Sequence, residues 1–275
     1  MMLNLSEVSK LKFKIKRFKI SVYMNELIRK SLNVIRNEGI ISFIRRINYH
    51  IIGAILTPYF INKLKRETSQ ISNLEDLVDL AFNFKIKDVI ILPGQIKEEI
   101  LELLRILGRI KPKTILEIGT AHGGTLFLLS QVADDNATII SIDLPWSKLG
   151  YPIWKVPIYK SFAKSNQKIH LIRSDSHSEK TLEKVKRILG NRKIEFLFID
   201  GDHSYEGVKM DFEMYSKLVK ENGGIIGLHD IVPGSKGLVG GAPKFWEEVK
   251  NKYKKSIEIV KDWKQGGYGI GLIFL

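Results

Sequence analysis

The chain contains no cysteine among its 275 residues. This absence excludes disulfide bonds, thiolate zinc sites and cysteine nucleophiles, and it favours a reducing compartment. Long apolar runs are missing too, because Arg45, Arg46 and His50 interrupt residues 40–62, the most apolar part of the N-terminal region. The remaining runs are too short for a bilayer core of about 30 Å, so we expect no transmembrane helix.

A secretory signal is not expected either. Such a signal needs one uninterrupted apolar run after a basic start. Here Lys12, Lys14 and Lys16 occupy every second position of the first apolar stretch. The sequence therefore favours a cytoplasmic protein.

Acidic residues are scarce: 30 Asp and Glu oppose 44 Lys and Arg, which gives a net charge of +14. Residues 1–70 hold 14 basic and four acidic residues, and therefore carry +10 of this charge. With 44% hydrophobic and 27% charged residues, the composition is otherwise that of a folded globular protein. The length suits one large domain with an extension. Because the basic excess lies in the extension, the remaining chain need not bind nucleic acid.

Residues 1–72 are expected to form a basic, mostly helical extension, joined to the main domain through the polar segment 67–73. Two arrangements remain open for it. Its basic residues, beside Ile, Leu and Phe, suit a helix that lies on an anionic membrane surface. An apolar helix face that packs on the main domain as a cap is the alternative. The basic residues concerned are Arg29, Lys30, Arg36, Arg45 and Arg46.

From residue 96 onward, short apolar strands alternate with helical patterns, which is typical of a parallel sheet covered by helices. A first helix begins near Ile96 and ends before Pro112. Strands are expected at 114–118, 138–143, 169–173, 194–200, 224–229, 257–260 and 269–274, and helices near 125–133, 155–165, 178–189, 205–220 and 243–253. The predicted fold class is α/β: a doubly wound, seven-stranded, mostly parallel Rossmann-like sheet within residues 73–275.

The strongest local signal is the turn Glu-Ile-Gly-Thr-Ala-His-Gly-Gly at residues 117–124, between a strand and a helix. Its glycines let the backbone approach a ligand, and the helix start offers free amide donors. A pyrophosphate-binding turn would read Gly-x-Gly-x-x-Gly, whereas here an acid precedes the first glycine. A carboxylate repels phosphate but suits a cationic sulfonium with an amino group, as in S-adenosylmethionine. The expected cofactor contacts in the turn are Glu117, Gly119, Thr120, Ala121, Gly123 and Gly124.

Three further residues are candidates for cofactor binding. Asp143 ends the second strand of the series, where a carboxylate can accept hydrogen bonds from both ribose hydroxyls. Asp175 and Ser176 follow the third strand, where they could face the adenine ring. Asp and Ser are also common turn residues, so an ordinary turn is the alternative for this pair.

A second chemical signal follows the strands at 194–200 and 224–229, where Asp200 and the pair His229-Asp230 stand at the carboxyl ends. Ligands bind at this edge of open α/β sheets. Two acids with an imidazole suggest a site for a divalent ion such as magnesium, or for a transition ion if His229 is a ligand. His203 lies three residues beyond Asp200. We expect it to be the general base, with Asp200 as a second catalytic residue that also faces the cofactor.

These segments resemble metal-dependent class I O-methyltransferases. The likeness is strongest to the group of macrocin and mycinamicin sugar O-methyltransferases, rhamnosyl O-methyltransferases and cephalosporin hydroxylases. It covers roughly residues 90–275 and rests on four segments, at residues 116–125, 198–205, 229–230 and 241–246. The resemblance implies that Asp200 matches the metal aspartate after the fourth strand, and that His203 matches a histidine base. It also implies that His229 and Asp230 take the places of an acidic pair, from which this sequence departs by the histidine.

The expected function is therefore S-adenosylmethionine-dependent O-methylation of a hydroxyl group, with a divalent metal, Mg²⁺ in the first place. The resemblance implies a sugar, glycan or glycosylated small molecule as the acceptor. Trp146, Tyr151 and Trp154 either line an acceptor pocket or belong to the core. Besides the acceptor, the partners that the sequence leaves open are a membrane surface for the basic extension and a second copy of the chain. No base-binding signature indicates a specific nucleic-acid partner.

Two rival functions come from other classes. A nicotinamide-dependent oxidoreductase uses a similar sheet, but Glu117 and the missing third glycine oppose it. A non-catalytic scaffold on a degenerate Rossmann fold would use the +10 extension to bind membranes or nucleic acids in a salt-sensitive way.

Overall fold

The computed structural model describes residues 36–275, except residues 38, 43, 46 and 146–149. The chain divides into two compact units, Met1–Ile52 and Gly53–Leu275. All described residues of the first unit are helical. The alternating segment at 11–16, the basic residues Arg29 and Lys30, and the aromatic Trp146 lie outside the described residues. The division at residue 72 that composition indicates remains a prediction about domains.

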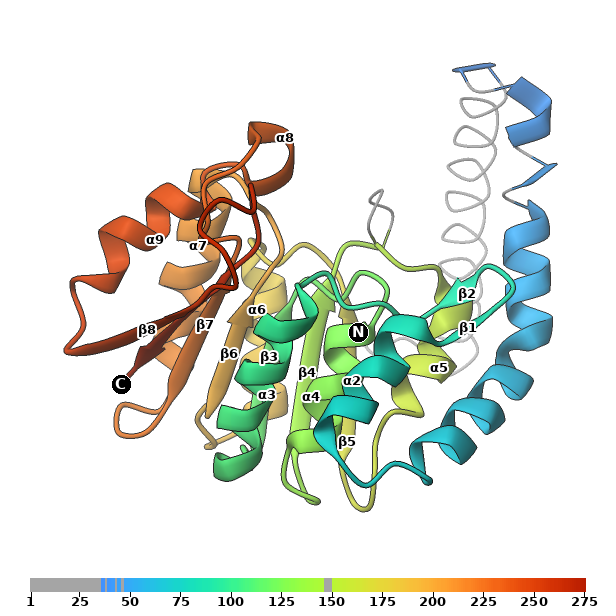
Figure 1. Cartoon of the computed structure of the whole chain (residues 1–275), viewed down its shortest axis with the longest axis horizontal. Helices are drawn as coiled ribbons and strands as arrows, with labels where there is room; N and C mark the ends of the chain where they lie inside the picture. Colours follow the sequence, from blue (N-terminus) through green and yellow to red (C-terminus); the bar gives the residue numbers. More distant parts are fainter. Residues whose placement is uncertain (1–35, 38, 43, 46, 146–149) are drawn as a thin grey trace, which may run out of the picture. The chain divides into compact units, whose positions relative to one another are not determined.

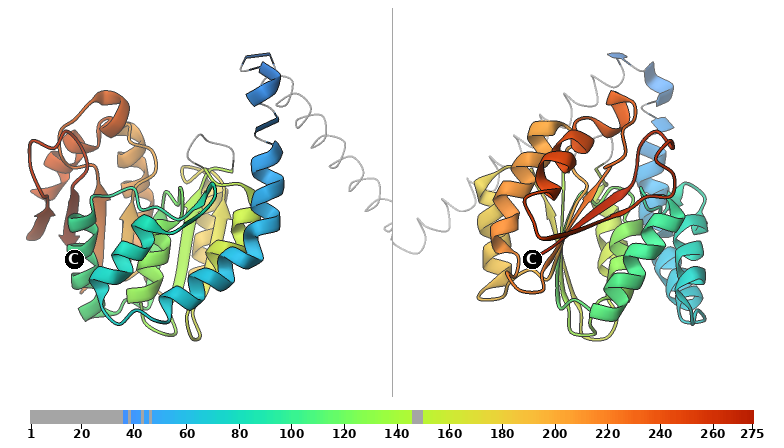
Figure 2. Two further views of the ribbon diagram at one scale, coloured as in Figure 1. Left: turned by 45° about the vertical axis from the view of Figure 1, so that its right-hand side comes forward. Right: turned by 60° about the vertical axis from the view of Figure 1, so that its left-hand side comes forward.

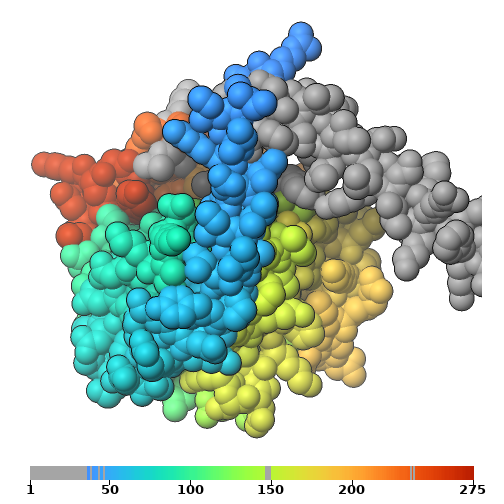
Figure 3. Space-filling view, turned by 90° about the vertical axis from the view of Figure 1, so that its right-hand side faces the viewer, coloured from blue at the N-terminus to red at the C-terminus, as the bar shows by residue number. Residues whose placement is uncertain are grey.

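Helical residues 53–68 open the second unit, and their closest approach to its core is at a glycine. A Cβ atom on Gly53 would lie 2.5 Å from the ring of Trp154, so only glycine lets the helix approach so closely. Figure 3 shows this helix against the segment that contains Trp154. Trp154 and Tyr151 are 8% and 1% exposed, so both belong to the core, whereas a contact with the acceptor remains a prediction.

A sheet of seven strands forms the centre of the second unit (Figure 1). The strand order is β5-β4-β3-β6-β7-β9-β8, in which β9 runs antiparallel to its neighbours β7 and β8 and all other pairs are parallel. The strands are β3 (Thr114–Ile118), β4 (Thr138–Asp143), β5 (Lys168–Arg173), β6 (Phe196–Ile199), β7 (Ile225–His229), β8 (Lys255–Ile259) and β9 (Ile270–Phe274). The carboxyl ends of β3, β4, β6 and β7 therefore meet at one edge, where the chemical signals of the sequence lie.

Helices cover both faces of the sheet (Figure 2). One face carries α3 (Lys97–Ile110) and α4 (Gly124–Val132), with α2 (Leu74–Asn83) packed on both. The other face carries α6 (Glu179–Leu189), α7 (Tyr205–Tyr215) and α9 (Ala242–Lys250), over a core that includes Leu116, Ile140 and Leu197. The shorter elements are the hairpin β1 (Lys85–Ile86) and β2 (Val89–Ile90), η1 (Ile153–Lys155), α5 (Val156–Lys160), η2 (Ser216–Leu218) and α8 (Lys236–Val239).

The predicted fold is confirmed, with corrections at element ends. The helix expected at 155–165 ends at Lys160, and the helix expected at 243–253 ends at Lys250. All seven strands form, and β3 and β4 have the predicted limits. The strand expected at 194–200 spans only Phe196–Ile199, so Asp200 already belongs to the following loop. The helix expected at 205–220 ends at Tyr215, because the chain tightens into the 3₁₀ turn η2 before the next strand. Among the described residues, no helix is both long and apolar enough to cross a membrane.

Candidate active site

The glycine turn after β3 is built for close backbone approach. Gly119 has φ +97°, and a Cβ atom there would lie 1.9 Å from the carbonyl oxygen of Asp200. Gly123 has φ +81°, and a Cβ atom there would meet the ring of Tyr159 at 2.5 Å. The turn therefore packs against the Tyr159 ring at Gly123 and against the loop that follows β6 at Gly119. A side chain at Gly119 or Gly123 would push aside the backbone that is predicted to contact the cofactor.

Glu117 lies at this turn with one carboxylate oxygen unused. The side chain is completely buried, and Oε2 accepts a hydrogen bond of 2.5 Å from the Ser141 hydroxyl, whereas Oε1 has no partner. Burial raises the pKa of Glu117 to about 8, and the charges of Asp200 and Asp143 act in the same direction. A buried carboxylate with a free oxygen is costly unless a cation or donor pairs with it. Glu117 is therefore poised for a positively charged ligand group.

The other residues predicted in the turn make different contacts. The hydroxyl groups of Thr120 and Ser141 lie 2.5 Å apart, so the Thr120 side chain faces the sheet and orients Ser141. The Ala121 amide donates to Asp143 Oδ2 at 2.8 Å, and the Leu144 amide donates to Oδ1 at 2.6 Å. Burial raises the pKa of Asp143 to about 6. Asp143 thus stands at the end of β4 as predicted, and it also fixes the glycine turn.

The loop predicted to face adenine is anchored by α7. The Tyr215 hydroxyl donates to the carbonyl oxygen of Ser176 at 2.6 Å. His177 Nε2 lies 3.3 Å from Oδ1 of the fully buried Asp211. Asp175 is exposed and accepts a hydrogen bond from the His177 amide. The contact between His177 and Asp211 was not predictable from the sequence, because the two residues lie on separate elements.

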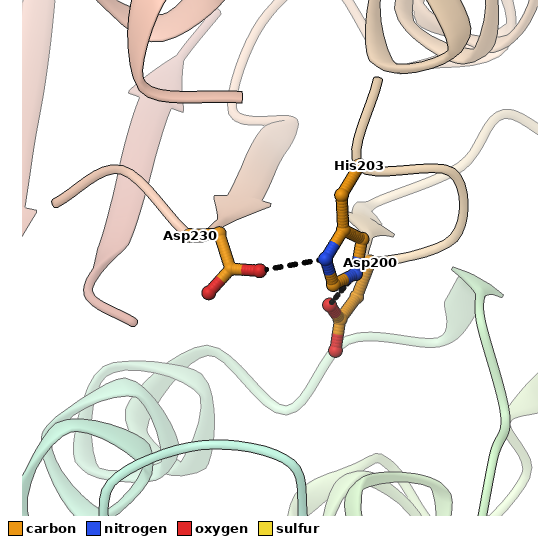
Figure 4. A group of neighbouring side chains, drawn as sticks. All are labelled: Asp200, His203 and Asp230. Carbon is orange, nitrogen blue, oxygen red and sulfur yellow. Dashed lines mark ion pairs between the residues drawn. The ribbon is translucent and has the colours of Figure 1, made fainter. Parts of the chain in front are cut away.

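Asp200, His203 and Asp230 meet at the same sheet edge (Figure 4). His203 Nδ1 lies 2.9 Å from Asp230 Oδ2, and its Nε2 lies 3.6 Å from Asp200 Oδ1. One potential ligand atom from each of the three residues lies within 4.8 Å of the others. His203 is 30% exposed at its side chain and Asp230 only 4%, so the imidazole is the part of the cluster open to an acceptor.

His229, predicted as a metal ligand, contacts the cluster through Asp200. Its Nδ1 donates to Asp200 Oδ1 at 2.9 Å, whereas its buried Nε2 has no hydrogen-bond partner. Burial disfavours the imidazolium, but Asp200 and Asp230 outweigh this effect and raise the pKa of His229. The cluster of potential ligands thus contains His203 in the place that the sequence assigned to His229. Direct ligation by His229 remains a prediction.

Gln95 is a site residue that the sequence analysis missed. It is 4% exposed, its Nε2 donates to Asp200 Oδ2 at 2.8 Å, and its Oε1 accepts from the Thr125 hydroxyl at 2.7 Å. It therefore links the first turn of α4, next to the glycine turn, to the carboxylate of the cluster. The signal available in the sequence was the Pro93-Gly94 turn immediately before a strong helix.

Two loops hold the cluster in place. The Gly241 amide donates to the carbonyl oxygen of His203 at 2.7 Å, so segment 241–246 touches the histidine segment. The Tyr268 amide donates to Asp230 Oδ1 at 3.1 Å. The loop that carries Tyr268 is fixed by the buried Glu99, which accepts from the Lys261 and Gly269 amides. Both loops lie far from the cluster in sequence.

The side chains present fit both expected groups. For S-adenosylmethionine, the unpartnered Oε1 of Glu117 suits a cationic group. Gly119 and Gly123 have no Cβ atom that would keep the cofactor away from the backbone. For a divalent cation, two carboxylates and one imidazole form a mixed oxygen and nitrogen donor set. Such a set suits manganese or another transition ion at least as well as magnesium.

Residues 116–231 match the protein family described as Methyltransferase domain. Among solved structures, the O-methyltransferase from Bacillus cereus in complex with SAH is 15% identical, with a TM-score of 0.50 over 76% of this chain and 94% of that chain. The cofactor-bound Rv0187 from MTB is 14% identical, with a TM-score of 0.50 over 73% of this chain and 87% of that chain. No curated protein matches the chain. At these identities, the likeness to solved structures shows the fold alone.

Proposed function

We propose that the chain is an S-adenosylmethionine-dependent O-methyltransferase that methylates a hydroxyl of a sugar, glycan or glycosylated small molecule. The observation that carries the proposal is the direct contact between two sites. The glycine turn lies so close to the Asp200 loop that a Cβ atom on Gly119 would collide with the Asp200 backbone. In the same turn, one carboxylate oxygen of Glu117 has no hydrogen-bond partner. A methyl donor in the turn and a hydroxyl at the cluster would therefore be neighbours, as in-line transfer requires.

The family match over residues 116–231 supports the methyltransferase part of the proposal, because that segment holds the glycine turn, Asp200 and His203. The sugar acceptor rests on the resemblance of all four segments together, of which 198–205 and 241–246 are two, to sugar-methylating enzymes. Those two segments touch each other through the hydrogen bond from Gly241 to His203. The substrate class thus depends on residues that the fold brings to the same place.

The side chains of the cluster have defined tasks in this reaction. His203 accepts the proton of the acceptor hydroxyl, and Asp230, at 2.9 Å from Nδ1, orients the ring and stabilises its charged form. His229 and Gln95 each donate a hydrogen bond to Asp200 and fix both of its oxygens. The glycine turn and Glu117 orient the cofactor, whose sulfonium supplies the methyl group.

Asp200, His203 and Asp230 would hold the divalent cation. When bound, the cation supplies a lower pKa for the acceptor hydroxyl and charge stabilisation for the alkoxide. As a general base and as a metal ligand, His203 would use the lone pair of the same ring nitrogens. Chelation tests the cation: loss of activity would show that the reaction needs it, and retained activity would leave His203 as the base that Asp230 orients.

The function is tested by transfer of a labelled methyl group from S-adenosylmethionine to sugars, glycans and glycosylated small molecules, with and without chelator. We expect label on an oxygen of a sugar hydroxyl. Calorimetry with S-adenosylmethionine and NADH is the companion measurement. Tight NADH binding without S-adenosylmethionine binding would overturn the proposal in favour of an oxidoreductase.

Substitution of Glu117 by glutamine is expected to change how cofactor affinity depends on pH. Because the pKa of Glu117 is about 8, the group is mostly protonated and uncharged at lower pH. A cationic ligand favours the carboxylate, so binding releases a proton and affinity rises by up to about tenfold per pH unit as pH approaches 8. Above the pKa the affinity becomes constant.

Calorimetry in buffers of different ionisation enthalpy measures this proton release directly. The Glu117→Gln variant serves as the control, because the cofactor's own titration is common to both proteins. The variant should bind more weakly near pH 8 and lose the pH dependence. Equal proton release in both proteins would show that Glu117 does not face the cationic group.

A further inference from the structure

The helical residues of the first unit expose a row of large apolar side chains. Ile40, Ile44, Ile47 and Ile51 are 61%, 50%, 41% and 53% exposed. Their spacing of three and four residues places them on one face of a helix. Ile41 and Ile52 add 66% and 39% exposed side chains. We call these six residues the isoleucine face.

This concentration is unusual within the part of the chain that the structure describes. Of its 14 exposed large hydrophobic residues, eight lie between Ile40 and Tyr59. In the second unit, the helical residues 53–68 bury Gly53, Thr57, Phe60 and Leu64 and leave Ile55 and Tyr59 exposed, at 71% and 58%. Single exposed apolar residues are normal, but a contiguous apolar patch marks an interaction surface. Figure 3 shows the helix that carries Ile55 and Tyr59 on the outside of the second unit.

The charge of the same region indicates what binds there. Residues 39–52, which carry the isoleucine face, contain two arginines and no Asp or Glu, and Arg45, between Ile44 and Ile47, is exposed. A second copy of this face would bring basic residues against basic residues. A negatively charged lipid surface is complementary in both respects, because it accepts apolar side chains among its acyl chains and pairs basic residues with its headgroups.

We propose that the isoleucine face and its basic residues bind the surface of an anionic lipid bilayer. The helix lies in the interface and does not cross the membrane, since Arg45 and His50 interrupt it and no described helix meets the requirements of a span. The proposal concerns a different surface from the proposed active site and does not depend on the methyltransferase reaction.

The test is flotation of the full chain with vesicles of phosphatidylcholine alone or mixed with phosphatidylglycerol. We expect binding to the mixed vesicles and little to phosphatidylcholine alone. Ile44→Glu and Ile51→Glu, each in a helical position that tolerates Glu, should lower partitioning by about tenfold or more apiece. Arg45→Gln should lower it by about fivefold. Met210→Glu, at a 45% exposed apolar residue of α7, is the matched control that should leave binding unchanged.

Three results would overturn the proposal. Vesicle binding that Ile44→Glu and Ile51→Glu leave unchanged would exclude the isoleucine face. Equal binding to neutral and anionic vesicles would exclude the role of charge. A full chain that is oligomeric by light scattering, becomes monomeric in Ile44→Glu and binds no vesicles would assign the face to contact between copies. Helix content by circular dichroism, and methyl transfer to a water-soluble acceptor, should stay unchanged in every variant.

Discussion

Alanine in place of His203 is expected to lower the rate of methyl transfer by about 10²- to 10⁴-fold, the usual contribution of a positioned general base. The imidazole lies 2.9 Å from Asp230 and 3.6 Å from Asp200, so its loss removes the proton acceptor or the nitrogen ligand of the cluster. The change should appear in kcat, because the His203 imidazole contacts the two carboxylates of the cluster. The dissociation constant of S-adenosylmethionine should stay within about twofold of the wild-type value.

The matched control for His203 is Glu206→Ala on the exposed surface of α7, three residues along the chain. It should retain wild-type activity and melting temperature. Single-turnover kinetics with labelled cofactor measures the rate of methyl transfer, and calorimetry measures cofactor binding. Together they separate an effect on the chemical step from an effect on affinity. A His203→Ala enzyme with nearly normal kcat, or with cofactor affinity lost in proportion to rate, would remove His203 from the chemistry.

Substitution of Gly119 by alanine is expected to abolish cofactor binding and to destabilise the fold. The new Cβ atom would lie 1.9 Å from the carbonyl oxygen of Asp200, and the φ of +97° is unfavourable for any L-residue with a side chain. Strain and displacement together should cost about 2–4 kcal/mol of unfolding free energy. Because the turn and the Asp200 loop must separate, cofactor affinity should fall by about 100-fold or more.

Gly108→Ala in α3 is the control for the Gly119 prediction. No atom lies within 4 Å of a Cβ atom built on Gly108, and its backbone is helical. Alanine there should stabilise the protein by about 0.5–1 kcal/mol. Chemical denaturation and calorimetry measure both variants. Normal cofactor affinity in Gly119→Ala would show that the turn does not cradle the cofactor.

The fold was predictable from the sequence because its signals are local. Each strand of the parallel sheet is a short apolar run, and each helix carries its own apolar period, which places β3 and β4 at their predicted limits. The end of α7 was not predictable, since Val219 continues the apolar spacing of the helix although the backbone has already entered a 3₁₀ turn. Its burial is decided by packing and not by helix geometry.

The candidate site was predictable in part, for the same reason. Asp200 and Asp230 each follow a predicted strand, and neighbouring parallel strands end at one edge, so their proximity follows from topology. The contact of His203 with both carboxylates was not accessible, because it depends on the direction of its side chain. Gln95 and Glu99 were missed because their partners lie 105 and more than 160 residues away in the chain.

The sequence by itself determined the α/β class, the glycine turn with its preceding acid, and the two strand ends that carry acids. These features arise from periodicity and from residues adjacent in the chain. Only the tertiary structure decided that Oε1 of Glu117 stays without a partner, that His203 lies between two carboxylates, and that the isoleucine face is exposed. Burial, unpaired atoms and side-chain direction result from packing between elements, and local sequence patterns do not contain that information.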